Sequence, residues 1–176
     1  MPRIRQAKKE LQRIHNSLRS VDLFSECSEE ELSAIRRLTT YHRARSRQTL
    51  MRQGDWSSEF FVIVEGQVEV VREGAMVASP GPGSFVGEMG LLHRTPRSAT
   101  VTTTSSADLL VASVREFAMI LELVPPVARQ IKEASAQRRH RDLEVGLLER
   151  RDPTGDPETG ASGFTSMHQP IRGSAP

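Results

Sequence analysis

The sequence predicts an α+β fold that is mainly β: a barrel or a jelly-roll sandwich of short strands with helices on both sides. Two observations support this prediction. From about Thr39 to Ser113, short strand-like stretches are separated by turn-forming glycine and proline. Before and after this region, apolar residues recur at spacings of three and four, as they do along one face of a helix.

The first helix is expected over residues 1–20. Its apolar face consists of Ile4, Ala7, Leu11, Ile14 and Leu18. Its other face is basic, because the segment holds six Lys or Arg residues and one acidic residue, Glu10. A solvated helix face is one interpretation. A docking surface for an acidic partner, nucleic acid or membrane headgroups is the other, which leaves peripheral membrane contact open.

A second helix is expected to begin at Ser28. Ser28 and Glu31 have the spacing of a capping box, in which each side chain accepts a hydrogen bond from the other residue's backbone N–H. Leu32, Ile35 and Leu38 supply the apolar stripe of this helix.

Strands are expected in the stretches QTLMRQGD, EFFVIVEG, QVEVVREG, ATVTTT and ADLLVASV. The alternation Val68-Glu69-Val70 has the period of two that a strand with one buried face requires. ASPGPGS, at residues 78–84, is a turn-forming cluster that a helix or a central strand does not accommodate. Helical spacing returns at residues 115–123, and Pro125-Pro126 ends that helix.

The last helix is expected from about Val127 through Arg141. Beyond it, the sequence becomes rich in Pro, Gly, Ser, Thr and charged residues, which bury too little apolar surface to offset their ordering entropy. The expected organisation is therefore a basic helix at 1–20, one domain at 21–141 and a disordered tail at 142–176.

Several classes of function are excluded at this level. Cys27 is the one cysteine, which rules out an internal disulfide framework and is typical of a reduced, cytoplasmic setting. The five histidines are scattered, so no metal site is expected. No nucleophile–base pair, hydrolase elbow or Walker loop is present, so we expect neither catalytic residues nor enzyme activity. The sequence has no run of 18 apolar residues, so no membrane span is expected.

The segment FVGEMGLLHRTPRSATV, at residues 85–101, carries the most chemistry. Gly87 lets the backbone approach a ligand closely, and one helical turn after it leaves N–H groups for an anion. Arg97 offers a guanidinium with the fork geometry for a phosphate, and Ser98 adds a hydroxyl. A carboxylate beside a phosphate must face donors, so Glu88 suits sugar hydroxyls. Taken alone, Glu88 and Arg97 also fit an ordinary surface ion pair.

The string GEMGLLHRTPRSA resembles the phosphate-binding cassette of cyclic nucleotide-binding domains, of the catabolite activator and protein kinase A regulatory-subunit type. That cassette typically reads F-G-E-x-A-L-L, a short spacer, then R-[ST/A]-A. Gly54 and Gly66 fall where this family places turn glycines. The resemblance extends from about Leu23 to Ala136. It implies a jelly-roll-like β-roll flanked by N-terminal helices and two C-terminal helices, with a short phosphate-binding cassette helix.

The resemblance also implies roles for individual residues. Glu88 would accept from the ribose 2′-hydroxyl, Arg97 would pair with the exocyclic phosphate oxygens, and Ser98 would complete the phosphate cradle with backbone N–H groups. Val70 and Val77 would line the base. The predicted ligand-binding residues are Gly87, Glu88, Met89, Gly90, Arg97, Ser98, Val70, Val77, Val86 and Ala99, with Ile131 and Arg138 as lid residues over the base.

The implied function is a sensor for cAMP or cGMP, without a further cofactor, whose C-terminal helices change position on binding and act on an unknown protein effector. Many bacterial relatives carry a helix-turn-helix domain after the final helix. Here a polar tail follows, so DNA binding is not expected. The alternative is a degenerate domain that binds no ligand and acts as an interaction module through its basic face.

The sequence departs from the family pattern in three places. Val86 precedes the glycine where many members have phenylalanine or another apolar residue, which is harmless. Gly90 stands where alanine is usual, which is expected to loosen the short helix by about 1 kcal/mol. The last helix loses its apolar stripe after Ala134, which argues against a long dimerisation helix.

Overall fold

The computed structural model describes residues 18–149, so residues 1–17 of the predicted basic helix and residues 150–176 of the predicted tail lie outside the described residues. Two 3-10 helices, η1 (Leu18–Ser20) and η2 (Asp22–Phe24), lead into helix α2 (Glu29–Arg37). The strands of the β-roll are β1 (Thr40–Ala44), β2 (Thr49–Met51), β3 (Glu59–Glu65), β4 (Val68–Arg72), β5 (Ala75–Ala78), β6 (Phe85–Val86), β7 (Thr100–Thr103) and β8 (Ala107–Ser113). Helix α3 (Glu88–His93) lies between β6 and β7, and helices α4 (Val114–Leu123) and α5 (Pro125–Glu149) follow β8.

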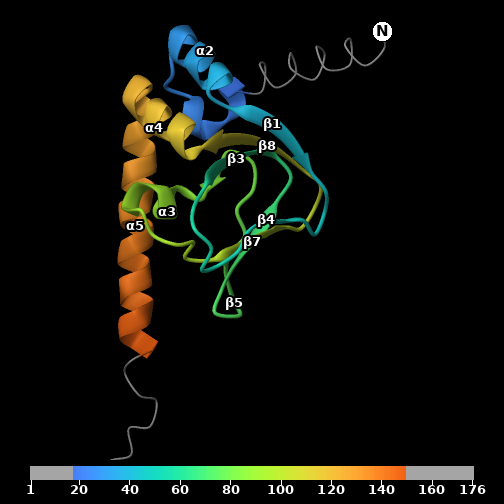
Figure 1. Ribbon diagram of the computed structural model, residues 1–176, viewed down its shortest axis with the longest axis vertical. Coiled ribbons are helices and arrows are strands. Elements are labelled where there is room, and N and C mark those ends of the chain that lie inside the picture. The colour runs from blue at the N-terminus through green and yellow to red at the C-terminus, as the bar shows by residue number, and fades with distance from the viewer. Residues whose placement is uncertain (1–17, 150–176) are drawn as a thin grey trace, which may run out of the picture.

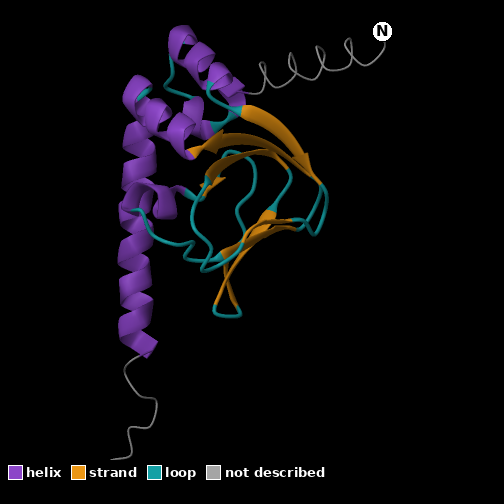
Figure 2. Cartoon of the chain, viewed as in Figure 1, coloured by secondary structure: helices purple, strands orange, loops and turns teal. Residues whose placement is uncertain are grey.

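The strands form two four-stranded antiparallel sheets, in the orders β1-β8-β3-β6 and β2-β7-β4-β5. Figure 1 shows α2, α4 and the start of α5 grouped at one end of the β-roll, while α5 continues along its side past α3. Figure 2 shows the strands curving as one roll beside this helical layer. The predicted α+β fold with a β-roll and flanking helices is therefore confirmed.

Strand β3 lies at the centre of the molecule and buries both of its faces. Phe60, Val62 and Val64 pack toward the helices, and Phe61 and Ile63 pack between the two sheets. Because both faces are covered, its five central residues are all buried and apolar, without the alternation of a half-exposed strand. This strand joins the two halves of the core.

The helical half of the core is built around three aromatic rings. Phe60 lies 5.7 Å from Phe85 and 4.8 Å from Phe117, measured between ring centroids, in tilted arrangements. Ile131 of α5 is fully buried in the same cluster. The first half of α5 is thus anchored to the β-roll by apolar packing.

Helix α2 begins as the sequence predicts. The Ser28 hydroxyl accepts from the Glu31 N–H, and the Glu31 carboxylate accepts from the Ser28 N–H at 2.8 Å. A second capping box, between Ser113 and Glu116, begins α4 in the same way. Such reciprocal bonds satisfy N–H groups that a helix start otherwise leaves without partners.

Helix α5 does not end near Arg141 as predicted, but continues to Glu149. The prediction of disorder from residue 142 is therefore wrong for residues 142–149. The stretch DLEVGLLE contains several good helix formers, Leu and Glu, and no proline, so the helix propagates through it even though the earlier apolar stripe has ended.

Two further findings concern the described residues 18–149. No helix there combines the length and apolar character that a membrane crossing needs. No group of three or more His, Cys, Asp or Glu side chains gathers there in a way that could hold a metal ion.

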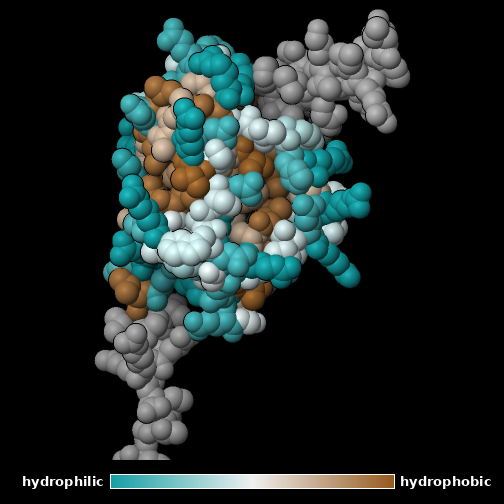
Figure 3. Space-filling model, viewed as in Figure 1, coloured by the Kyte–Doolittle hydropathy of each residue, from teal (hydrophilic) through white to brown (hydrophobic). Residues whose placement is uncertain are grey.

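Figure 3 shows apolar surface exposed among hydrophilic side chains near the helical end of the molecule.

Candidate functional site

Helix α3 begins at Gly87, whose backbone has φ = 95°. This left-handed conformation is rarely adopted by residues with a side chain. A Cβ built on Gly87 would also lie 2.6 Å from Arg97 Nη1 and 2.9 Å from the Glu59 carbonyl oxygen. Glycine is thus required both for the turn into α3 and for the close approach of Arg97.

The Arg97 guanidinium holds the start of α3 against β3. Its Nη1 donates to the Gly87 carbonyl at 2.9 Å, and its Nη2 donates to the Glu59 carbonyl at 2.6 Å. The residue is 6% exposed. Burial lowers the pKa of Arg97, and the nearby carboxylates of Glu59 and Glu88 oppose that shift. The guanidinium remains the cation of this region, since arginine stays protonated in proteins.

Glu88, the first residue of α3, is fully buried. Its Oε1 accepts from Nη1 of Arg138 at 2.7 Å, and this ion pair links α3 to α5. Its Oε2 has no hydrogen-bond partner within residues 18–149. A buried carboxylate oxygen without a donor is costly, because it has lost its water and gained nothing in exchange.

The inner face of α5 changes character along its length. Its first turns bury Val127, Ala128 and Ile131, and the positions that continue this face are the polar residues Ser135, Arg138 and Asp142. These three residues follow the helical spacing of three and four. The apolar stripe therefore does not stop after Ala134 for lack of a packing surface; it is replaced by a polar one.

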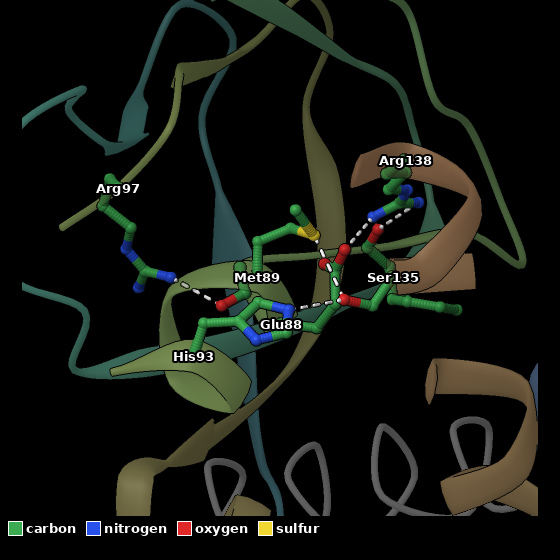
Figure 4. A network of polar contacts seen from close by, with 8 residues as sticks. Glu88, Met89, His93, Arg97, Ser135 and Arg138 are labelled. Carbon is green, nitrogen blue, oxygen red and sulfur yellow. Dashed lines mark hydrogen bonds and ion pairs between the residues drawn. The ribbon is translucent and has the colours of Figure 1, made fainter. Parts of the chain in front are cut away.

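Ser135 and Arg138 both reach the cassette helix (Figure 4). The Ser135 hydroxyl lies 3.2 Å from the Met89 sulfur and 3.3 Å from Nε2 of His93. Figure 4 also shows Arg97 and Arg138 approaching α3 from opposite sides. Helix α3 is thus held between β3, through Arg97, and α5, through Ser135 and Arg138.

Asp142 connects α5 to the rim of the second sheet. Arg72, the last residue of β4, donates from Nη1 to Asp142 Oδ1 at 2.6 Å and from Nε to the Ser98 carbonyl at 3.1 Å. Arg72 therefore joins three elements: β4, which carries it, the end of the cassette and α5.

A cavity of about 780 Å³ lies between the second sheet, α3 and α5. Its volume falls in the range typical of small-molecule sites, and it has apolar walls with a few polar groups. Its lining residues are Met51, Val70, Arg72, Glu73, Ala75, Val77, Ala78, Pro80, Val86, Gly87, Glu88, Met89, Gly90, Ser98, Ala99, Val101, Arg138, Arg141 and Asp142.

Most of the predicted site residues border this cavity. The structure brings together on its walls Val70, Val77, Val86, Gly87, Glu88, Met89, Gly90, Ser98, Ala99 and Arg138. Two predicted residues are placed differently. Arg97 is not part of the lining, because its guanidinium is bound to two carbonyls behind Gly87. Ile131 lies in the core instead of over the cavity, so the prediction that it forms a lid there is not met in this structure.

The sequence prediction missed the rim of the cavity. Arg72, Glu73, Arg141 and Asp142 border it at its polar edge. The signal that could have found two of them is helical spacing: Arg141 and Asp142 are three and four residues after Arg138, which places them on the same side of α5. Arg72 carries no such signal, because its contacts depend on the tertiary arrangement of β4, α5 and the cassette.

This combination of features defines a class of protein. A β-roll with a short helix on one wall of a ligand-sized cavity, and a long helix packed across that wall, is a small-molecule-binding domain. The family model described as "Cyclic nucleotide-binding domain" matches residues 41–123. Those residues, which include the cassette, belong to the cyclic nucleotide-binding domain family.

Two curated proteins are similar in sequence to this chain. The cAMP-dependent protein kinase regulatory subunit of Yarrowia lipolytica is 32% identical over 95 residues, which cover 54% of this chain and 25% of that protein. The Pycsar effector protein XpPycTIR of Xanthomonas perforans is 40% identical over 91 residues, covering 51% of this chain and 30% of that protein. The chain therefore spans less than a third of the length of these two curated relatives.

A solved structure supports the same fold. The crystal structure of the Thermus thermophilus catabolite activator protein superposes with a TM-score of 0.63 and 27% identity, covering 72% of this chain and 62% of that chain. The domain has a non-catalytic fold, and the homologues are regulatory domains of larger proteins.

Proposed function

We propose that the chain is a cytoplasmic sensor that binds cAMP or cGMP in the cavity beside α3. The observation that carries this proposal is Glu88, a fully buried carboxylate at the cavity wall whose Oε2 lacks a donor among the described residues. A ribose 2′-hydroxyl is a donor of the right size for this oxygen. A ligand that places it there removes the unfavourable burial of an unpaired acceptor.

The phosphate of the ligand would lie at the other side of the cassette. Ser98 is exposed to the cavity and offers a hydroxyl, and the backbone N–H groups from Gly87 to Gly90 begin a helix. Arg97 uses two of its five N–H donors for the Gly87 and Glu59 carbonyls, which leaves donors for a phosphate oxygen after a small displacement. Its charge then compensates the anion in a largely desolvated place.

The base would lie against the apolar part of the cavity, where Val70, Val77 and Ala99 form the wall. The polar rim around Arg72, Glu73 and Asp142 would face the edge of the base. Both cAMP and cGMP fit this description, and the name of the Yarrowia relative, a cAMP-dependent protein kinase regulatory subunit, supports cAMP as the first candidate.

The response to the ligand would pass through α5. This helix contacts the cassette through Ser135 and Arg138, and the rim through Asp142, so a shift of α3 toward a bound phosphate changes contacts that position α5. A ligand that binds one arrangement of these contacts better shifts the population toward it. A protein effector would recognise the resulting position of α5.

One observation favours the alternative function, a ligand-free interaction module. In this structure Arg97 donates to two backbone carbonyls behind the cassette, and Arg138 occupies one oxygen of Glu88, so both ionic groups already have protein partners. A degenerate domain would retain this closed arrangement and use the basic face of the molecule for docking.

Thermal unfolding of the full chain with and without about 1 mM cAMP or cGMP distinguishes the two functions. A ligand present at 100 times its Kd stabilises the folded state by about 2.7 kcal/mol, which raises Tm by several degrees. We expect such a rise with at least one nucleotide and none with AMP. If neither nucleotide raises Tm and the protein binds anionic vesicles in a salt-sensitive way, the alternative holds.

A further inference from the structure

Helix α4 buries one face and exposes the other. Phe117 and Ile120 point into the helical half of the core. Seven large hydrophobic side chains are exposed within residues 18–149, and three of them belong to this ten-residue helix: Val114, Met119 and Leu123, at 50%, 36% and 51%. Figure 3 shows apolar surface at the end of the molecule where Figure 1 places α4. Single exposed apolar residues are ordinary, but their concentration on one short helix indicates an interaction site.

Two opposite charges lie on the same exposed face. Arg115 and Glu122 are both exposed and stand seven residues apart. Seven residues make about two helical turns, so the two side chains leave the helix in the same direction, roughly 10 Å apart along its axis. Ala118 and Met119 are exposed between them. Within residues 18–149, neither charged side chain forms a hydrogen bond or an ion pair. The face therefore offers a cation, two apolar residues and an anion, in that order.

This order is complementary to its own reverse. A two-fold axis that passes between Ala118 and Met119 is equally far from Arg115 and from Glu122. An antiparallel second copy of α4 therefore places its Glu122 opposite Arg115 and its Arg115 opposite Glu122. The Met119 side chains of the two copies meet beside the axis, where flexible thioethers adapt well to each other. Contacts that occur twice in this reciprocal way are typical of an isologous dimer interface.

We propose that the outer face of α4 docks a second copy of this chain, with the two helices antiparallel across a two-fold axis beside Met119. The inference goes beyond the proposed function and does not depend on it, because no residue of α4 lines the candidate nucleotide cavity. A helix of this length is about 15 Å long, so the interface is at the small end of the range for specific complexes. The dimer should accordingly be weak and dependent on concentration.

The apolar and charged residues of this face should contribute differently. Exposed ion pairs add little affinity, so burial of Met119 should provide most of it. The two ion pairs should instead determine the orientation, because a parallel arrangement of the helices would set Arg115 against Arg115 and Glu122 against Glu122.

Sedimentation velocity of the full chain, from about 10 μM to about 1 mM, measures the association. The wild type should change from monomer to dimer over this range. Met119→Lys sets two cations side by side at the axis and should remain monomeric. Met76→Lys is the matched control, because Met76 is a methionine that is 67% exposed on another element, β5. It should associate as the wild type does.

Charge reversal tests the antiparallel arrangement. Arg115→Glu alone makes both charged positions acidic, and Glu122→Arg alone makes both basic. Each variant should therefore dimerise about tenfold or more weakly than the wild type. In a mixture of the two variants, an acid faces a base at both positions again. The mixture should form heterodimers at concentrations where each variant alone is monomeric, and the double variant should dimerise by itself.

The outcomes separate this inference from the proposed function. A wild type that is monomeric at every concentration overturns the inference. Dimers that persist in Met119→Lys, or a mixture that associates no better than its components, overturn it as well, because the copies then meet through another face. Circular dichroism checks that each variant is folded. Nucleotide affinity, measured by calorimetry on the same variants, should be unchanged, and failure of the wild type to bind nucleotide would overturn the proposed function alone.

Discussion

The hydroxyl of Ser57 occupies the space that a methyl group on Gly90 would need. A Cβ built on Gly90 would overlap the Ser57 Oγ and would lie 2.9 Å from both the Ser57 Cβ and the Thr95 carbonyl oxygen. Gly90 lies in the middle of α3, and Ser57 lies in the loop before β3. The residue that departs from the usual cassette pattern is therefore matched to its surroundings.

Gly90→Ala should destabilise the protein, although helix propensity alone would favour alanine by about 1 kcal/mol. Overpacking of this kind typically costs about 1–3 kcal/mol, because a side chain or the backbone must move. Urea unfolding measures the change in the free energy of unfolding. The double variant Gly90→Ala with Ser57→Gly should recover part of the loss, whereas a stabilised Gly90→Ala protein would contradict this account.

Arg97→Ala should weaken both the fold and ligand binding. Without its guanidinium, the carbonyls of Gly87 and Glu59 lose their donor, which costs about 1–3 kcal/mol of stability even when no nucleotide is present. Affinity for the nucleotide should fall about tenfold or more. Urea unfolding and calorimetry measure the two effects, with the exposed Arg115→Ala as the control. Wild-type stability and affinity in Arg97→Ala would contradict the role of Arg97 in the candidate site.

Asp142→Asn should accelerate release of a bound nucleotide. The Asp142–Arg72 ion pair holds α5 at the cavity rim, and both side chains are about one-third exposed, 35% and 29% respectively. Such a pair contributes at most about 1 kcal/mol, so the dissociation rate should rise about two- to fivefold. Stopped-flow release of a fluorescent nucleotide analogue measures this rate.

The salt dependence of the release rate and a charge swap provide the controls for the Asp142–Arg72 ion pair. The difference between Asp142→Asn and wild type should shrink at high ionic strength, because salt screens an exposed pair. Arg72→Asp combined with Asp142→Arg should slow release again. Equal rates in all variants would show that the ion pair does not restrain α5.

Cys27 should be unreactive in the folded protein. Burial, together with the nearby carboxylates of Glu31 and Glu26, raises the pKa of its thiol from 9.0 to about 11. The thiolate is the nucleophile, so alkylation at pH 8 should be slow until urea unfolds the chain. Because the folded pKa is the higher one, the thiol's contribution to stability is present below pH 9 and is lost as the pH rises toward 11. Rapid alkylation of the folded protein would contradict this placement.

Local signals in the sequence were sufficient for much of the fold. The capping box of Ser28 and Glu31, the apolar run of β3 and the glycines at residues 54 and 66 each determine a conformation within a few residues. The two-residue strand β6 escaped prediction because it is too short to show a period, and its pairing with β3 is tertiary. The end of α5 was misplaced because loss of an apolar stripe was equated with loss of the helix.

In the candidate site, too, some features follow from the local sequence and others depend on tertiary contacts. The segment from Gly87 to Ser98 is recognisable as a linear pattern, and the structure places its two ends, Gly87 to Gly90 and Ser98, on the wall of the cavity. The partners of its charged groups were not predictable, because they come from distant elements: Glu59 from β3 for Arg97, and Arg138 from α5 for Glu88. A pattern can identify which side chains carry the chemistry, but not which protein groups hold them before a ligand binds.

The most direct test of the central claim is titration calorimetry of the full chain and of Glu88→Gln with cAMP and cGMP. Glu88→Gln keeps the size of the side chain and removes the charge that a ribose hydroxyl and Arg138 share. We predict one saturable site in the wild type for at least one nucleotide, and affinity about tenfold or more weaker in Glu88→Gln. No binding by the wild type, or equal affinity in the two proteins, would contradict the account.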